Sequence, residues 1–137
     1  PLVPGGFVTG DQGLGHVVIN VAPALYDPTI AFYRDLLGHE LIWRSETTVG
    51  FRMPDSEAEI VIQNEREYQE TDLKVDSADE AAQRIEASGG RVVAGPFDIA
   101  IGRAVIVEDP WGNRMVMLDN SKGRLLTDDE DNVTGAG

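Results

Sequence analysis

The sequence predicts an α+β fold in which one β-α-β-β-β unit occurs twice. Three observations predict it. Segments of alternating apolar and polar residues are separated by only two stretches with helical spacing. The order of segments over 14–66 recurs over 67–120. A proline, Pro54 or Pro110, marks the turn before the last strand of each copy.

In the first copy, the opening strand presents two different faces. We expect the aliphatic face to be buried and the other face to look into a cavity or water. The aliphatic face holds Val17, Ile19 and Val21, and the other holds His16, Val18 and Asn20. Asp27-Pro28 predicts a helix start, with Asp27 as the cap, and Gly38 predicts its end. Strands are predicted over 40–45, 48–53 and 58–63.

In the second copy, a strand is predicted over 70–75. Ser77 and Glu80 have the spacing of a capping box, which predicts a helix that runs to about Ser88 and ends at Gly89-Gly90. Further strands are predicted near 91–94, 102–108 and 114–119. Two such units form one domain, in which a curved mixed sheet surrounds a cleft and the helices cover its outer face.

The ends of the chain differ from these units in composition. Residues 1–13 carry two prolines and read as an extended arm, and residues 121–137 read as a flexible acidic tail. The chain has no cysteine, no apolar run of membrane-spanning length and no signal-peptide pattern, so we expect a cytoplasmic protein.

The formal net charge of −13 excludes nucleic acid as a partner, because binding a polyanion requires clustered basic residues. Two interpretations of this charge stay open. An acidic surface keeps a protein soluble at high salt, and an acidic field attracts cationic ligands.

Three motifs resemble the vicinal oxygen chelate superfamily, which includes glyoxalase I, bleomycin-resistance proteins and extradiol dioxygenases. They are Gly15-His16 at the start of a strand, the Phe32-Tyr33-x-x-Leu36-Leu37-Gly38 helix end, and the Asp109-Pro110-x-Gly112-Asn113 turn. The lead-in over residues 6–18 is similar to the start of the catalytic half of type I extradiol dioxygenases. The resemblance implies a fold of two βαβββ modules that often dimerises.

The resemblance also implies where a metal would be bound. The family takes its ligands from matching strand positions, which here are His16, Glu70, Val61 and Val116. Two of these four can ligate a metal. A register shift on the strand of Val61 would bring in Glu59 or Gln63 as a third ligand.

Three functions therefore stay open. The first is a metal-free protein that binds a small aromatic or cationic molecule in the cleft, as a homodimer. The second is a dioxygenase or glyoxalase-type lyase that holds one divalent ion (Fe, Mn, Ni or Zn) on His16, Glu70 and a shifted third ligand. The third is an inactive fragment or redesign of an extradiol dioxygenase. Beyond the metal positions, the predicted cleft residues are Asn20, Trp43, Phe51, Glu59, Gln63, Asp72 and Arg114.

Overall fold

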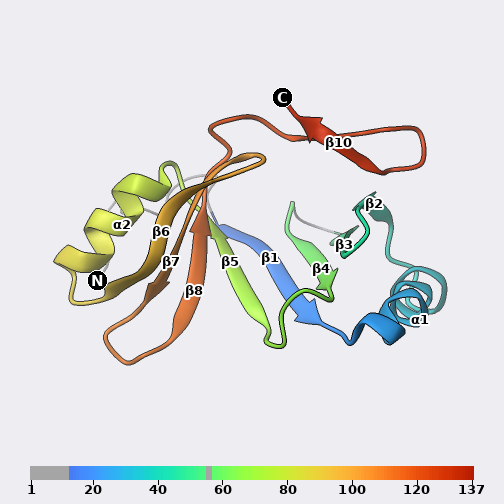
Figure 1. The fold of residues 1–137 in the computed structure, drawn as a ribbon, viewed down its shortest axis with the longest axis horizontal. Helices are drawn as coiled ribbons and strands as arrows, with labels where there is room; N and C mark the ends of the chain where they lie inside the picture. Colours follow the sequence, from blue (N-terminus) through green and yellow to red (C-terminus); the bar gives the residue numbers. More distant parts are fainter. Residues whose placement is uncertain (1–12, 55–56) are drawn as a thin grey trace. The chain divides into compact units, whose positions relative to one another are not determined.

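The computed structural model describes residues 13–54 and 57–137 and has a mixed α+β fold (Figure 1). It divides into two compact units, built on Gly15–Glu70 and on Thr71–Leu125. We call these the N-terminal and the C-terminal unit. The predicted arm over 1–13 lies outside the described residues, except for Gly13, which begins the first strand.

The N-terminal unit has four strands in the order β2-β3-β4-β1. β1 (Gly13–Asn20) pairs in parallel with β4 (Glu59–Gln63), and β3 (Thr48–Arg52) lies antiparallel between β4 and β2 (Leu41–Arg44). The four predicted strands are confirmed to within a few residues.

The helical segment of this unit differs from the prediction. It begins earlier and consists of a 3-10 turn (η1, Pro23–Leu25), a short α-helix (α1, Tyr26–Ala31) and a π-helical turn (η2, Phe32–Leu36). The expected cap, Asp27, lies inside the first turn of α1, and Leu25 occupies the cap position without a side-chain hydrogen bond. The helix end at Gly38 is confirmed by its φ of +79°.

One face of the N-terminal sheet packs against this helical segment. The core there consists of Tyr26, Ile30, Val49, Phe51 and Ile62. Phe51 is completely buried, so the prediction that it lines a ligand cleft is corrected: its position on β3 directs it to the helix side. The expected faces of β1 hold for Ile19 and Val21, which pack against this core, whereas Val17 is 39% exposed and Val18, on the other face, is 2% exposed.

The C-terminal unit repeats the topology, with the strand order β5-β8-β7-β6. β5 (Glu70–Lys74) pairs in parallel with β8 (Arg114–Leu118), which pairs antiparallel with β7 (Gly102–Glu108), which in turn pairs antiparallel with β6 (Arg91–Ile99). β6 is longer than predicted and is interrupted by register shifts. α2 (Ala78–Ala87) begins as predicted, because the Ser77 side chain accepts a hydrogen bond from Glu80 N.

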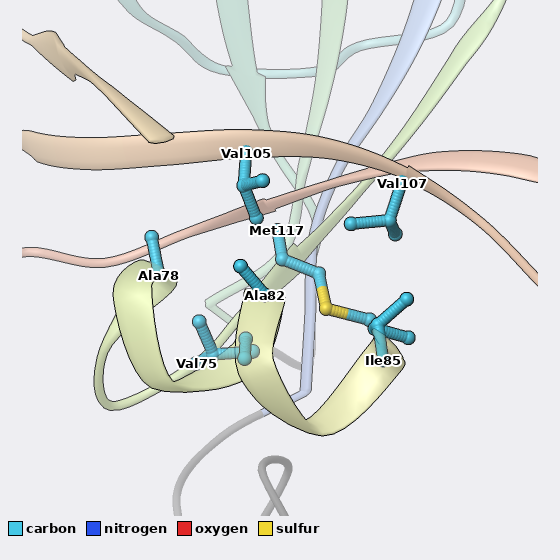
Figure 2. Close-up of a cluster of buried hydrophobic side chains, with 8 residues drawn as sticks. Val75, Ala78, Ala82, Ile85, Val105, Val107 and Met117 are labelled. Atoms are coloured by element: carbon cyan, nitrogen blue, oxygen red, sulfur yellow. The ribbon is translucent and has the colours of Figure 1, made fainter. Parts of the chain in front are cut away.

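The core of the C-terminal unit lies between α2 and its sheet (Figure 2). Small residues on α2 let the helix approach the strands closely, and Ile85 meets the strand side chains near the helix end. The buried set is Val75, Ala78, Ala81, Ala82, Ile85, Val105, Val107 and Met117.

The acidic tail is folded, contrary to the prediction of a flexible segment. β9 (Leu125–Thr127) and β10 (Val133–Ala136) form a hairpin, and Arg44 N on β2 donates a hydrogen bond to Asp131 O. The hairpin turn is closed by Asp128, whose Oδ1 accepts hydrogen bonds from the Glu130 and Asn132 amides. These local bonds order a segment whose polar composition favours disorder.

Candidate functional site

The parallel register of β1 and β4 places a histidine beside a carboxylate. His16 is the register partner of Glu59, and His16 Nε2 lies 3.6 Å from Glu59 Oε1. Each side chain is 21% exposed, so solutes can reach both. The β4 residue beside His16 is therefore Glu59, one of the two candidates that a register shift would bring in.

Trp43 on β2 reaches the same carboxylate. Its indole Nε1 donates a hydrogen bond of 2.6 Å to Glu59 Oε1. Trp43 pairs with Gly50 on β3, and β2 is irregular between Leu41 and Trp43. Such irregularities re-aim side chains. We call His16, Trp43 and Glu59 the HWE cluster. It lies on the sheet face opposite Phe51 and the helical segment.

Gln63 shares this face but is completely buried. Its Oε1 accepts hydrogen bonds from the Glu65 and Arg66 amides, and its Nε2 donates to the Arg66 and Tyr68 carbonyls. The side chain therefore holds the loop after β4 in place. Asn20, its register partner on β1, is half-buried.

Glu70 stands at the start of β5. Its carboxylate lies 3.5 Å from Arg66 Nε, and its side chain is 15% exposed. Arg66 also lies 3.7 Å from Glu65. The structure thus places Glu70 beside a guanidinium.

The remaining predicted residues belong to the C-terminal unit. Asp72 is buried and is the register partner of Val116. Arg114 is exposed, and its Nη2 donates a hydrogen bond of 3.2 Å to Glu108 Oε2, while Arg91 Nε binds the other oxygen at 3.0 Å. The guanidinium groups of Arg114 and Arg91 lower the pKa of the Glu108 carboxyl. Arg114 is therefore already paired within its own unit.

The family's divalent metal can be tested against these residues. Catalytic sites for such ions take about three protein ligands. His16 and Glu59 supply two donors side by side, and the family positions Val61 and Val116 hold buried aliphatic side chains. Within 13–54 and 57–137, no group of three or more His, Asp and Glu side chains is arranged to hold a metal ion. The described residues thus do not fit a complete family metal site.

Two features of the site were not recognised from the sequence. One is the Trp43–Glu59 hydrogen bond, because these residues are 16 positions apart and meet only through strand pairing. The other is Gly50, over which the Trp43 ring lies. A glycine inside a predicted strand is a signal for close packing, and it could have directed attention to this position.

Comparison with known proteins places the chain in a family. The family model described as "Glyoxalase/Bleomycin resistance protein/Dioxygenase superfamily" matches residues 13–117. A 45-residue stretch, 33% of this chain, is 49% identical to 3-methylcatechol 2,3-dioxygenase of Pseudomonas putida and covers 15% of that protein. A 50-residue stretch, 36% of this chain, is 43% identical to an uncharacterized protein of Mycolicibacterium smegmatis and covers 43% of it.

Solved structures show the same fold. Methylmalonyl-CoA epimerase from Mycobacterium tuberculosis superposes with a TM-score of 0.69 and 21% identity, over 88% of this chain and 93% of that one. An extradiol ring-cleaving dioxygenase from Brevibacterium fuscum gives a TM-score of 0.64 and 18% identity, over all of this chain and 36% of that one. A Mn(II)-bound glyoxalase from Novosphingobium aromaticivorans gives a TM-score of 0.59 and 19% identity, over 79% of this chain and 38% of that one.

The resemblance carried by the histidine strand, the helix end and the Asp109 turn is thus confirmed over most of the chain. No helix in the described part is long and apolar enough to cross a membrane. The chain belongs to the glyoxalase/bleomycin resistance protein/dioxygenase superfamily.

Proposed function

We propose that the chain binds a small aromatic cation against the HWE cluster, without needing a metal ion. The observation that carries the proposal is the Glu59 carboxylate, which is partly exposed and lies between an indole N–H and an imidazole. A carboxylate next to aromatic groups favours a ligand that carries positive charge and a flat apolar surface. The formal net charge of −13 acts in the same direction by attracting cations.

Two probes of equal shape test this proposal. 1-Methylquinolinium and 1-methylnaphthalene differ in charge, so titration calorimetry or probe fluorescence with both isolates the electrostatic contribution. We expect the cation to bind at least about tenfold more tightly, which is roughly 1.4 kcal/mol. Glu59→Gln should remove this preference. The matched control is Glu108→Gln, which neutralises a carboxylate held by two arginines of the other unit and should leave the preference intact. Equal affinity for the two probes would refute the proposal.

A second candidate function is metal-dependent catalysis of the dioxygenase or glyoxalase type. It is favoured by one observation, the 3.6 Å distance between His16 Nε2 and Glu59 Oε1. The third ligand would be Glu70, which the described residues do not bring together with the other two, so metal binding would require a rearrangement of these side chains. Elemental analysis after incubation with Fe(II), Mn(II), Ni(II) or Zn(II) tests it. One equivalent retained by the native protein and lost in His16→Ala would support this candidate, and retention of no ion would reject it.

The quaternary state is a further part of the proposal. We expect a homodimer, because the helical segment of the N-terminal unit exposes Leu25, Phe32, Leu36 and Leu37 to solvent. Light scattering coupled to size-exclusion chromatography measures the mass directly. A mass near 14.9 kDa at all concentrations would contradict this expectation.

A further inference from the structure

The backbone conformation at Gly50 does not require a glycine. It lies in the interior of β3 and does not adopt a positive φ angle, so any residue could take its conformation. Glycine in the interior of a strand weakens it and marks a close approach of another group. The approaching group here is the indole of Trp43. A β-carbon added at Gly50 would lie 2.8 Å from Trp43 Cδ1 and closer still to Nε1 and Cε2.

Because glycine has no side chain, the indole ring of Trp43 can lie over residue 50. Trp43 stands on β2, whereas Glu59 stands on β4, with β3 between them. The ring must therefore cross β3 to donate to Glu59 Oε1, and it crosses at Gly50, the register partner of Trp43. An alanine at this position would occupy the space that the ring fills.

The hydrogen bond from the indole in turn determines which oxygen of Glu59 is presented to a ligand. Oε1 accepts from Trp43 and faces His16. Within the described ranges, no hydrogen bond is found to the other oxygen, Oε2. A carboxylate fixed through one oxygen presents the second, which carries negative charge, in a defined direction, where it attracts a hydrogen-bond donor or a cation.

We propose that Gly50 is the positioning residue of this site. It leaves room for the Trp43 ring to lie across β3 and to bind Glu59. Trp43 then holds the Glu59 carboxylate so that Oε2 is directed to a positively charged N–H or N-alkyl group of the ligand. This inference rests on the proposed function for the ligand, but its geometric part can be tested without one. Gly50 does not itself touch the ligand; it acts through Trp43.

The first test uses the two indole N–H signals in a ¹H–¹⁵N correlation spectrum. Trp111→Phe assigns them, and exposed Trp111 serves as the internal reference for a free indole. In the native protein the Trp43 signal should lie downfield of that reference, because its N–H binds a carboxylate. Gly50→Ala and Glu59→Gln should each move it toward the reference. A Trp43 signal that stays in place in Gly50→Ala would overturn the proposal.

The second test guards against a variant that merely fails to fold. In the Trp43→Ala background the ring is absent, so Gly50→Ala should leave the melting temperature unchanged or raise it, since alanine suits a strand better than glycine. In the native background the same change should lower both the melting temperature and, about tenfold, the affinity for 1-methylquinolinium. If Gly50→Ala changed the melting temperature equally in the two backgrounds, the proposal that Gly50 positions Trp43 would be overturned. If the probe binds neither protein while the indole signals behave as expected, the proposed function fails and the positioning role stands.

Discussion

The two units share one topology but differ in the regularity of their helices and in the polar side chains that they carry. The C-terminal unit has a regular, capped helix of 10 residues, and its ion pairs include Arg91–Glu108, Arg103–Asp79 and Arg114–Glu108. The N-terminal unit has a helical segment of three helix types without a side-chain cap, and it carries the HWE cluster. The comparison indicates that the N-terminal copy of the repeat tolerates a less regular helical segment, and this copy holds the proposed site.

The largest effect is expected at Asp119, which joins the elements of the C-terminal unit. It is 4% exposed, and its carboxylate accepts hydrogen bonds from Ala78 N at the start of α2, from Arg103 N on β7, and from both N and Oγ of Ser121. Asp119→Ala leaves these donors without an acceptor and should cost on the order of 3 kcal/mol of unfolding free energy, measured by urea denaturation. Asp98→Asn, on the exposed surface of the same unit, is the control and should cost far less. A small loss in Asp119→Ala would show that the C-terminal unit is not organised by this residue.

The same carboxylate predicts how stability depends on pH. Burial opposes ionisation of Asp119, but hydrogen bonds from Ala78, Ser121 and Arg103 outweigh it and lower the pKa of the group. A lowered pKa in the folded state means that the stabilisation is complete above the pKa of the unfolded chain and is lost as the pH falls through the folded value. The urea midpoint of the native protein should therefore fall below about pH 4. Asp119→Asn should show a shallower fall, and parallel pH profiles would contradict this assignment.

A smaller effect separates the two helix starts. Ser77→Ala removes the cap of α2 and should cost about 1 kcal/mol. Asp27→Ala, at the residue that the sequence suggested as the cap of the first helix, should cost clearly less, because its side chain makes no cap hydrogen bond. Thermal unfolding of both variants measures the difference. Equal losses would mean that the two helix starts are not as different as the structure indicates.

The smallest effect concerns a turn found in both units, at Asp109 in the C-terminal unit and at Asp128 in the hairpin, which belongs to the N-terminal unit. Asp109 and Asp128 close their turns with the same set of hydrogen bonds to the asparagine four residues later and to the amides of the turn. The residue before that asparagine has positive φ in both, +88° at Gly112 and +64° at Asp131. Asp131→Gly should therefore raise stability by roughly 0.5 kcal/mol. Gly112→Ala should lower it. Destabilisation by Asp131→Gly would show that the aspartate side chain contributes more than the backbone angle costs.

Local signals predicted much of this molecule. The strands, the Ser77 cap, the glycine that ends each helix and the position of His16 on β1 follow from spacing over a few residues. The hairpin at the chain end was missed although Asp128 and Asn132 repeat the spacing of Asp109 and Asn113, because acidic composition outweighed the turn pattern. Phe51 was assigned to the wrong face because the register of β3 was unknown.

By itself, the sequence determined the repeat, the order of its elements and the family, since these depend on periodicity and on turn and capping residues close together in the chain. Only the tertiary structure decided that Glu59, and not Val61, stands beside His16, and that Trp43 reaches this carboxylate over Gly50. The physical reason is strand register: a shift of one residue turns every side chain to the other face, and register is selected by packing across the whole sheet.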